Sequence, residues 1–135
     1  MEDDFSLRRL YEMILSNSGF KVIATAENGD TALKMFKSFS TLPDIILMDH
    51  RMPIKNGLET MKEILEISQY PKIIFVSADV SVKQKALSSG SVSFLEKPFS
   101  IEVLLKEIKE VLSKSQAQDI HAWRGIKSCF LKGNF

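Results

Sequence analysis

Short apolar runs alternate with amphipathic stripes along most of this 135-residue chain. The apolar runs are Lys21 to Ala26, Ile45 to Met48, Ile73 to Val76 and Val92 to Leu95. The stripes have helical spacing and span Leu7 to Leu15, Ala32 to Phe36, Leu58 to Leu65, Ser81 to Ser89 and Ile101 to Leu112. Strands that alternate with helices at short spacing predict a parallel sheet with helices on both faces. We therefore predict an open, doubly wound α/β fold.

Local signals predict where these elements begin and end. Gly19 and Gly90 are expected to end helices, because glycine adopts a left-handed cap at little cost. Asp30 and Ser100 are placed to cap the helices that follow them. The run that stops at Asp49 is continuously apolar, as expected for a strand buried on both faces of a parallel sheet.

The composition is that of an ordinary globular protein of one domain, with 44% hydrophobic residues, 26% charged residues and a net charge of +1. Bulk charge gives no reason to expect direct nucleic-acid binding. The single cysteine, Cys129, cannot form an internal disulfide, which favours a reducing compartment, the cytoplasm. No stretch approaches the roughly 20 apolar residues of a membrane span, and the N-terminus lacks the apolar core of a signal peptide. We expect a protein that is neither exported nor embedded in a membrane.

Polar side chains follow three of the predicted strands, at Asp49, Ser77 and Glu96-Lys97. In open α/β sheets the working groups gather at the carboxyl ends of the strands. A carboxylate there can attack a phosphoryl group, given a divalent cation, a hydroxyl, a cationic side chain and further carboxylates to hold the metal. Ser77 offers the hydroxyl, Lys97 the cation, and Glu2 to Asp4 an acidic cluster ahead of the first helix.

The chain resembles the receiver domain of two-component response regulators in the order and spacing of several segments. These are DIILMDHRMP around Asp49, FVSAD around Ser77 and FLEKPF around Lys97, with acidic residues ahead of LRRLYEMIL. The resemblance covers Glu2 to about Ser113 and implies a flavodoxin-like (CheY-like) parallel sheet flanked by helices, with strand order 2-1-3-4-5. We accordingly divide the chain into a receiver domain, residues 1–115, and a C-terminal tail of unknown role, residues 116–135.

The resemblance also implies site roles. Asp49 would be the phospho-acceptor, Ser77 the hydroxyl that moves toward the phosphoryl group, and Lys97 the cation that pairs with it. Mg²⁺ would be the one cofactor, held by Glu2, Asp3, Asp49 and the main-chain carbonyl of Arg51.

Other expectations concern the output of the switch. By the same resemblance, Phe94 occupies the place of an aromatic residue that in the family swings inward with the hydroxyl and remodels the face of the fourth helix, fifth strand and fifth helix. That face is also a candidate homodimer contact. The resemblance also implies that the Lys97-Pro98 bond is cis, an isomer that is common only before proline. His50 and Arg51 flank the acceptor, where they either tune the phosphoryl lifetime or are ordinary solvated loop residues.

The resemblance implies a non-enzymatic signalling domain that takes a phosphoryl group from a histidine kinase or phosphotransfer protein and contacts an unidentified downstream protein. One alternative is a receiver-fold interaction module that works without phosphorylation. A flavin- or nucleotide-binding domain is permitted by the fold alone, but the sequence has neither a GxGxxG nor a Walker lysine motif.

One feature departs from the family. Met1 directly precedes Glu2, so the first strand is missing, and that strand would lie between the second and the third. Three arrangements are open: the second and third strands pair directly, another chain or the tail fills the position, or the sheet is incomplete. The tail is apolar for a disordered segment. It could pack on the protein's own surface, which we favour, fill the missing position, bind a partner, or begin a longer output segment.

Overall fold

The structure is a computed structural model that describes residues 13–26, 28–40, 42–50, 55–115 and 127–132. One parallel sheet contains five strands in the order β1-β5-β2-β3-β4. The strands are β1 (Phe20–Ala26), β2 (Ile45–Asp49), β3 (Lys72–Ser77), β4 (Ser93–Glu96) and β5 (Lys127–Lys132). The labelled helices are α2 (Gly29–Ser38), α3 (Gly57–Ile67), α4 (Lys83–Ser89) and α5 (Ile101–Ser115), with a short 3₁₀ turn, η1 (Val80–Val82), ahead of α4. Residues 13–17 are also helical.

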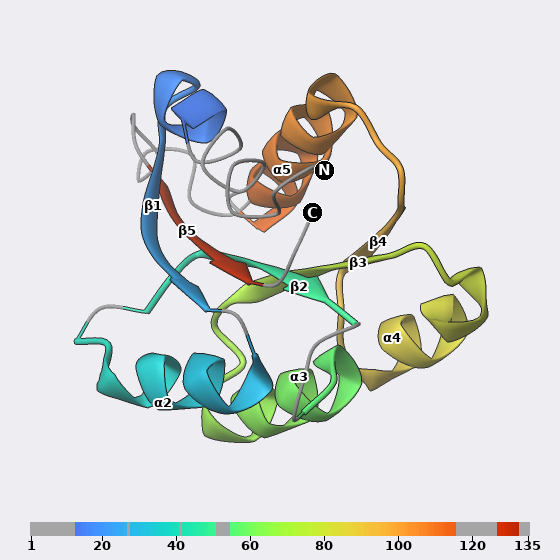
Figure 1. Cartoon of the computed structure of the whole chain (residues 1–135). Helices are drawn as coiled ribbons and strands as arrows, with labels where there is room; N and C mark the ends of the chain where they lie inside the picture. Colours follow the sequence, from blue (N-terminus) through green and yellow to red (C-terminus); the bar gives the residue numbers. More distant parts are fainter. Residues whose placement is uncertain (1–12, 27, 41, 51–54, 116–126, 133–135) are drawn as a thin grey trace, which may run out of the picture.

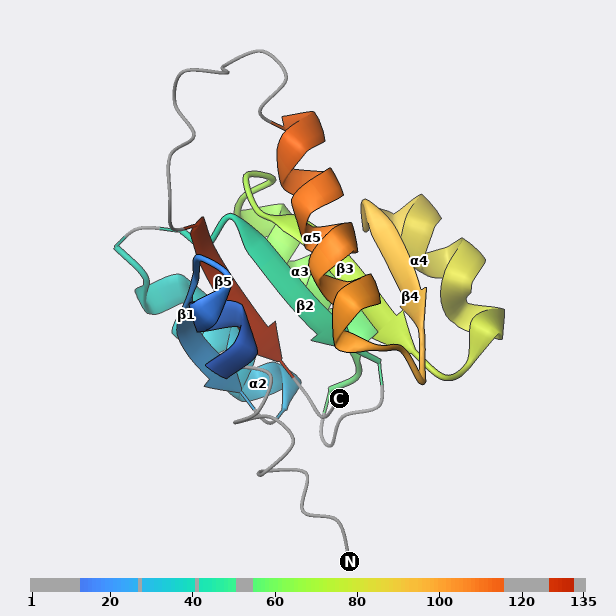
Figure 2. The ribbon, with the colours of Figure 1, turned by 90° about the horizontal axis from the view of Figure 1, so that it is seen from above.

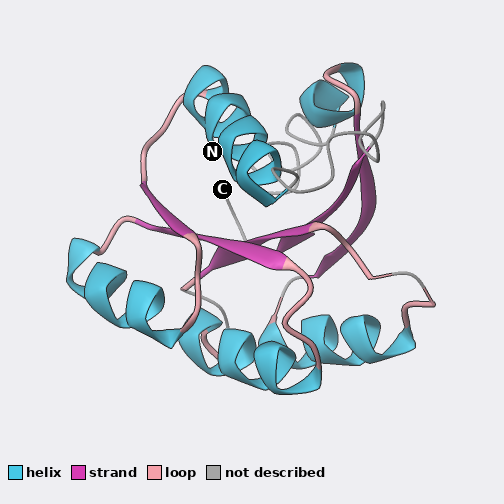
Figure 3. Ribbon diagram, turned by 180° about the vertical axis from the view of Figure 1, so that it is seen from behind, coloured by secondary structure: helices cyan, strands magenta, loops and turns pink. Residues whose placement is uncertain are grey.

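Helices cover both faces of the sheet. The helices α2, α3 and α4 lie on one face, and α5 lies on the other with the helix to which residues 13–17 belong (Figure 1). Figure 3 shows the same two layers from behind. The predicted doubly wound α/β fold is therefore confirmed.

Strand β5 lies in the position that the resemblance assigns to the first strand of the family. It lies between β1 and β2 and pairs with both in parallel (Figure 2). Cys129, for example, is aligned with Val22 on one side and with Ile45 on the other. Of the three arrangements that the sequence left open, the structure shows the second: residues 127–132 of the tail lie between β1 and β2. The expectation that the tail packs on the surface is wrong for residues 127–132, because both neighbouring strands offer them backbone partners.

The core forms two layers, one on each face of the sheet. Ile45 and Leu47 of β2 pack toward α5, whereas Ile46 and Met48 pack toward α2 and α3. Side chains alternate along a strand, so a strand covered on both faces must be apolar throughout. All five residues of β2 are buried, including the terminal Asp49. A carboxylate is costly to place between two apolar layers, so it comes at the end of the strand, where these layers stop.

The helix ends largely follow the local signals. Gly19 and Gly90 have φ of 94° and 125°, as predicted for residues that end helices. Ser100 accepts a hydrogen bond from the backbone N–H of Val103 at 3.2 Å, in keeping with its predicted cap. The prediction that Asp30 caps α2 is wrong. Asp30 lies in the first turn of this helix, and the cap is Asn28. Within the described residues, no helix is long and apolar enough to cross a membrane.

Candidate functional site

Asp49, Ser77 and Lys97 meet at the carboxyl edge of the sheet. Asp49 ends β2, Ser77 ends β3, and Lys97 directly follows β4. The backbone N–H of Lys97 donates to the carbonyl of Ser77 at 2.9 Å, which holds the chain after β4 against β3. Lys97 Nζ then donates to Asp49 Oδ2 at 2.7 Å. The structure thus brings together the three residues that the sequence singled out.

Burial makes this group chemically distinct from a surface ion pair. Asp49 is 3% exposed and Ser77 is 1% exposed. A buried carboxylate is costly unless a cation or hydrogen bonds compensate it, and the Lys97 ammonium provides a charge-assisted bond. The Ser77 hydroxyl accepts a hydrogen bond from the backbone N–H of Asp79 at 3.0 Å. The site therefore combines an anchored hydroxyl, a cation and a carboxylate at one edge.

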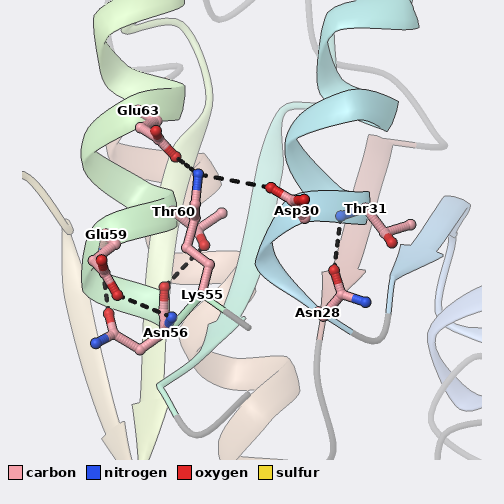
Figure 4. Close-up of polar contacts among 8 residues, drawn as sticks. All are labelled: Asn28, Asp30, Thr31, Lys55, Asn56, Glu59, Thr60 and Glu63. Carbon is pink, nitrogen blue, oxygen red and sulfur yellow. Dashed lines mark hydrogen bonds and ion pairs between the residues drawn. The ribbon is translucent and has the colours of Figure 1, made fainter. Parts of the chain in front are cut away.

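The segment after Asp49 is fixed at both of its described ends. The N–H of His50 donates to the carbonyl of Val76 at 3.3 Å, and the carbonyl of His50 accepts from the N–H of Gly57 at 3.0 Å. Asn56 caps α3 in a capping box: its side chain accepts from the N–H of Glu59, and the Glu59 carboxylate accepts from the N–H of Asn56 (Figure 4). Helix α3 consequently starts directly against the backbone of the candidate acceptor.

Gly57 leaves no room for a side chain at this junction. A Cβ atom there would lie 2.5 Å from the carbonyl oxygen of Asp49 and 2.9 Å from the Cα of His50, both rigid backbone atoms. We expect Gly57→Ala to lower the free energy of unfolding by about 1–3 kcal/mol, the range for overpacking. Urea unfolding measures the change. Helix propensity alone would raise stability by about 1 kcal/mol, so a stabilised variant would contradict this tight approach.

Charged side chains link α2 to α3. Lys55 donates to the carboxylate of Glu63 in α3, and its Nζ lies 3.9 Å from Asp30 Oδ1 in α2 (Figure 4). The hydrogen bond to Glu63, followed by the nearby negative charges, raises the pKa of Lys55. The sequence analysis did not find this contact. Asp30 and Lys55 belong to different elements, and no local pattern pairs them.

The predicted metal ligands are only partly covered by the structure. Glu2, Asp3 and Arg51 lie outside the described residues. Among the residues that are described, no group of three His, Cys, Asp or Glu side chains could hold a metal ion. Asp49 presents a carboxylate, the kind of hard oxygen ligand that Mg²⁺ prefers, so this part of the predicted ligand set fits the metal.

Phe94, the predicted switch residue, is a partly buried residue of β4 that packs against the core layer beneath α2, α3 and α4. Its ring is stacked on that of Phe75, with 6.2 Å between the centroids. The Lys97-Pro98 peptide bond is cis, as expected.

Comparisons with known proteins agree with this fold. A family model described as the response regulator receiver domain matches residues 1–109. The chemotaxis protein CheY of Bacillus subtilis is 35% identical over 115 residues, which are 84% of this chain and 94% of that protein. Among solved structures, a chain in the CheX-CheY-BeF3-Mg²⁺ complex from Borrelia burgdorferi matches with a TM-score of 0.73 and 27% identity, covering 82% of this chain and 84% of that one.

The fold is accordingly the flavodoxin-like, CheY-like fold, in which receiver domains of two-component signalling are found. The chain belongs to the response regulator receiver domain family. Some relatives are larger enzymes. A protein-glutamate methylesterase/protein-glutamine glutaminase of Hahella chejuensis is 36% identical over 101 residues, which are 73% of this chain but 26% of that protein.

Proposed function

We propose that this receiver domain is a switch that accepts a phosphoryl group on Asp49 from a histidine kinase or phosphotransfer protein and signals by a change of conformation. The observation that carries the proposal is the contact of 2.7 Å between Lys97 Nζ and the buried carboxylate of Asp49, beside the hydroxyl of Ser77. A nucleophile, a cation and a hydroxyl at one edge are the groups that phosphoryl transfer to a carboxylate requires.

In the proposed step, an oxygen of Asp49 attacks the phosphorus of a phosphohistidine. A phosphorus–oxygen bond forms while the phosphorus–nitrogen bond breaks, and its electron pair returns to the imidazole nitrogen, which takes up a proton. Lys97 balances negative charge on the transferred group, and the Ser77 hydroxyl donates to one of its oxygens. Asp49, Glu2, Asp3 and the main-chain carbonyl of Arg51 would hold Mg²⁺, which would supply further charge neutralisation when bound.

The same proposal covers the partners of the chain, the bounds of its domain and its cellular compartment. Phe94 and the surface of α4, β4 and α5 would face the downstream protein or a second copy of the chain. Residues 1–115 form the receiver domain, and the tail, residues 116–135, adds β5 to the receiver sheet. The chain itself acts without enzymatic turnover of a substrate, in the cytoplasm, and contacts neither nucleic acid nor membrane.

Mass spectrometry of the intact protein tests the proposal directly. We expect incubation with acetyl phosphate and Mg²⁺ to produce one phosphoryl adduct, and the same incubation with a chelator to produce none. Peptide mapping after reduction of the acyl phosphate is expected to assign the adduct to Asp49. Absence of an adduct on well-folded protein would instead favour the interaction module that works without phosphorylation. An adduct that forms equally with the chelator would rule out the proposed role of Mg²⁺.

A further inference from the structure

Three aromatic rings form a continuous row from the residue after Asp49 to Phe94. The ring centroids of His50 and Phe75 are 5.7 Å apart, and those of Phe75 and Phe94 are 6.2 Å apart. Phe75, the central ring, is completely buried, while Phe94 is partly buried. The row therefore connects the candidate acceptor with the predicted switch residue through a single core side chain.

Strand register explains how residues distant in the sequence come to lie in one row. Phe75 is aligned with Met48 of β2 on one side and with Phe94 of β4 on the other. Side chains alternate between the faces of a strand, so His50, two residues after Met48, falls on the same face. The rings thus cross β2, β3 and β4 near their carboxyl ends, on the face covered by α2, α3 and α4.

The ring of His50 packs against the ring of Phe75. Its Nδ1 atom is buried and has no hydrogen-bond partner within the described part of the chain. Its main chain is tied to β3 through Val76 and to α3 through Gly57. A shift of the backbone beside Asp49 would move this ring against Phe75. Close-packed interiors transmit such shifts, because they contain little empty space to absorb them.

We propose that Phe75 and His50 are positioning residues that couple the state of Asp49 to the position of Phe94. The inference rests on the proposed phosphorylation of Asp49 and adds a route to it. This route runs through ring contacts across the sheet, beside the one that starts from the Ser77 hydroxyl. It assigns a regulatory role to Phe75, which the sequence analysis did not select, and to His50, for which it left two readings open.

Nuclear magnetic resonance of the full chain with Mg²⁺ and beryllofluoride, a phosphoryl mimic, tests this coupling. In the parent we expect the amide signals of Ser77, Phe94 and Leu95 all to shift on addition of the mimic. In Phe75→Leu the shift at Ser77 is expected to persist, while the shifts at Phe94 and Leu95 fall about twofold or more. Phe36→Leu is the matched control, because Phe36 is equally buried in the same core layer but lies outside the row.

Two variants of the partly exposed His50 keep the test sharp if Phe75→Leu folds poorly. We expect His50→Leu to reduce the shifts at Phe94 and Leu95, and His50→Phe, which restores a ring, to retain them. Full shifts in both Phe75→Leu and His50→Leu would overturn the coupling while leaving phosphorylation intact. An equal loss in Phe36→Leu would also overturn it, since any weakening of the core would then suffice. A parent that fails to respond at Ser77 would overturn the proposed function, and this inference with it.

Discussion

Asp49→Asn is expected to abolish the phosphoryl adduct while leaving the protein folded. An amide oxygen is a poor nucleophile, and removing an attacking group typically lowers a reaction rate by roughly 10²-fold or more. Asparagine keeps an oxygen that can accept the hydrogen bond from Lys97, so the geometry at the end of β2 is preserved. The adduct is measured by intact mass after incubation with acetyl phosphate and Mg²⁺, and folding by circular dichroism.

Asp44→Asn is the matched control, because Asp44 precedes the opposite end of the same strand and accepts a hydrogen bond from the Tyr70 hydroxyl. We expect it to form the adduct at the rate of the parent. The assignment of Asp49 would be wrong if Asp49→Asn formed the adduct, or if both variants lost it together. The latter result would point to general disturbance of β2 rather than to loss of a nucleophile.

Cys129→Pro is expected to lower the free energy of unfolding by about 3 kcal/mol or more. Cys129 lies where β5 pairs with β1 and β2 at once. Proline has no backbone N–H and is excluded from the middle of a central strand, so it would interrupt the ladder. Folded domains are stable by only about 5–15 kcal/mol, and this loss would be plain in urea unfolding.

Cys129→Ala separates the backbone effect from the effect of losing the thiol. It keeps the N–H and is expected to unfold at a much higher urea concentration than Cys129→Pro. Equal unfolding free energies for the two variants would mean that β5 does not form part of the sheet in solution. Hydrogen exchange offers a second measurement: protection of the β2 amides should fall in Cys129→Pro, because β2 would lose one of its two neighbours.

The sequence was sufficient to predict where Asp49, Ser77 and Lys97 lie, because their places depend on local chemistry and one topological rule. The apolar run in β2 had to stop at a polar residue, and the carboxyl ends of parallel strands meet at one edge. The meeting of Asp49, Ser77 and Lys97 at that edge could therefore be predicted from their positions, whereas their predicted roles came from the resemblance to receiver domains. The caps at Gly19, Gly90 and Ser100 were predictable for the same reason, since a cap depends on a few neighbouring backbone groups.

Some local signals were ambiguous, and the backbone decided between them. Asn28 and Asp30 both have side chains suited to a helix cap. Asn28 has extended backbone angles, φ −144° and ψ 168°, and accepts from the N–H of Thr31 at 2.8 Å. Asp30 already lies inside the first turn, where its negative charge interacts favourably with the positive end of the helix dipole.

Only the tertiary structure decided which segment lies between β1 and β2, and which side chains contact Asp49 and its neighbours. The tail has apolar residues, but its pairing with two strands depends on how the rest of the sheet is assembled. The row of His50, Phe75 and Phe94 likewise depends on the register between three strands. Local sequence determines secondary structure and where polar groups end it, whereas strand order and register are set by long-range backbone pairing and burial, which no short segment encodes.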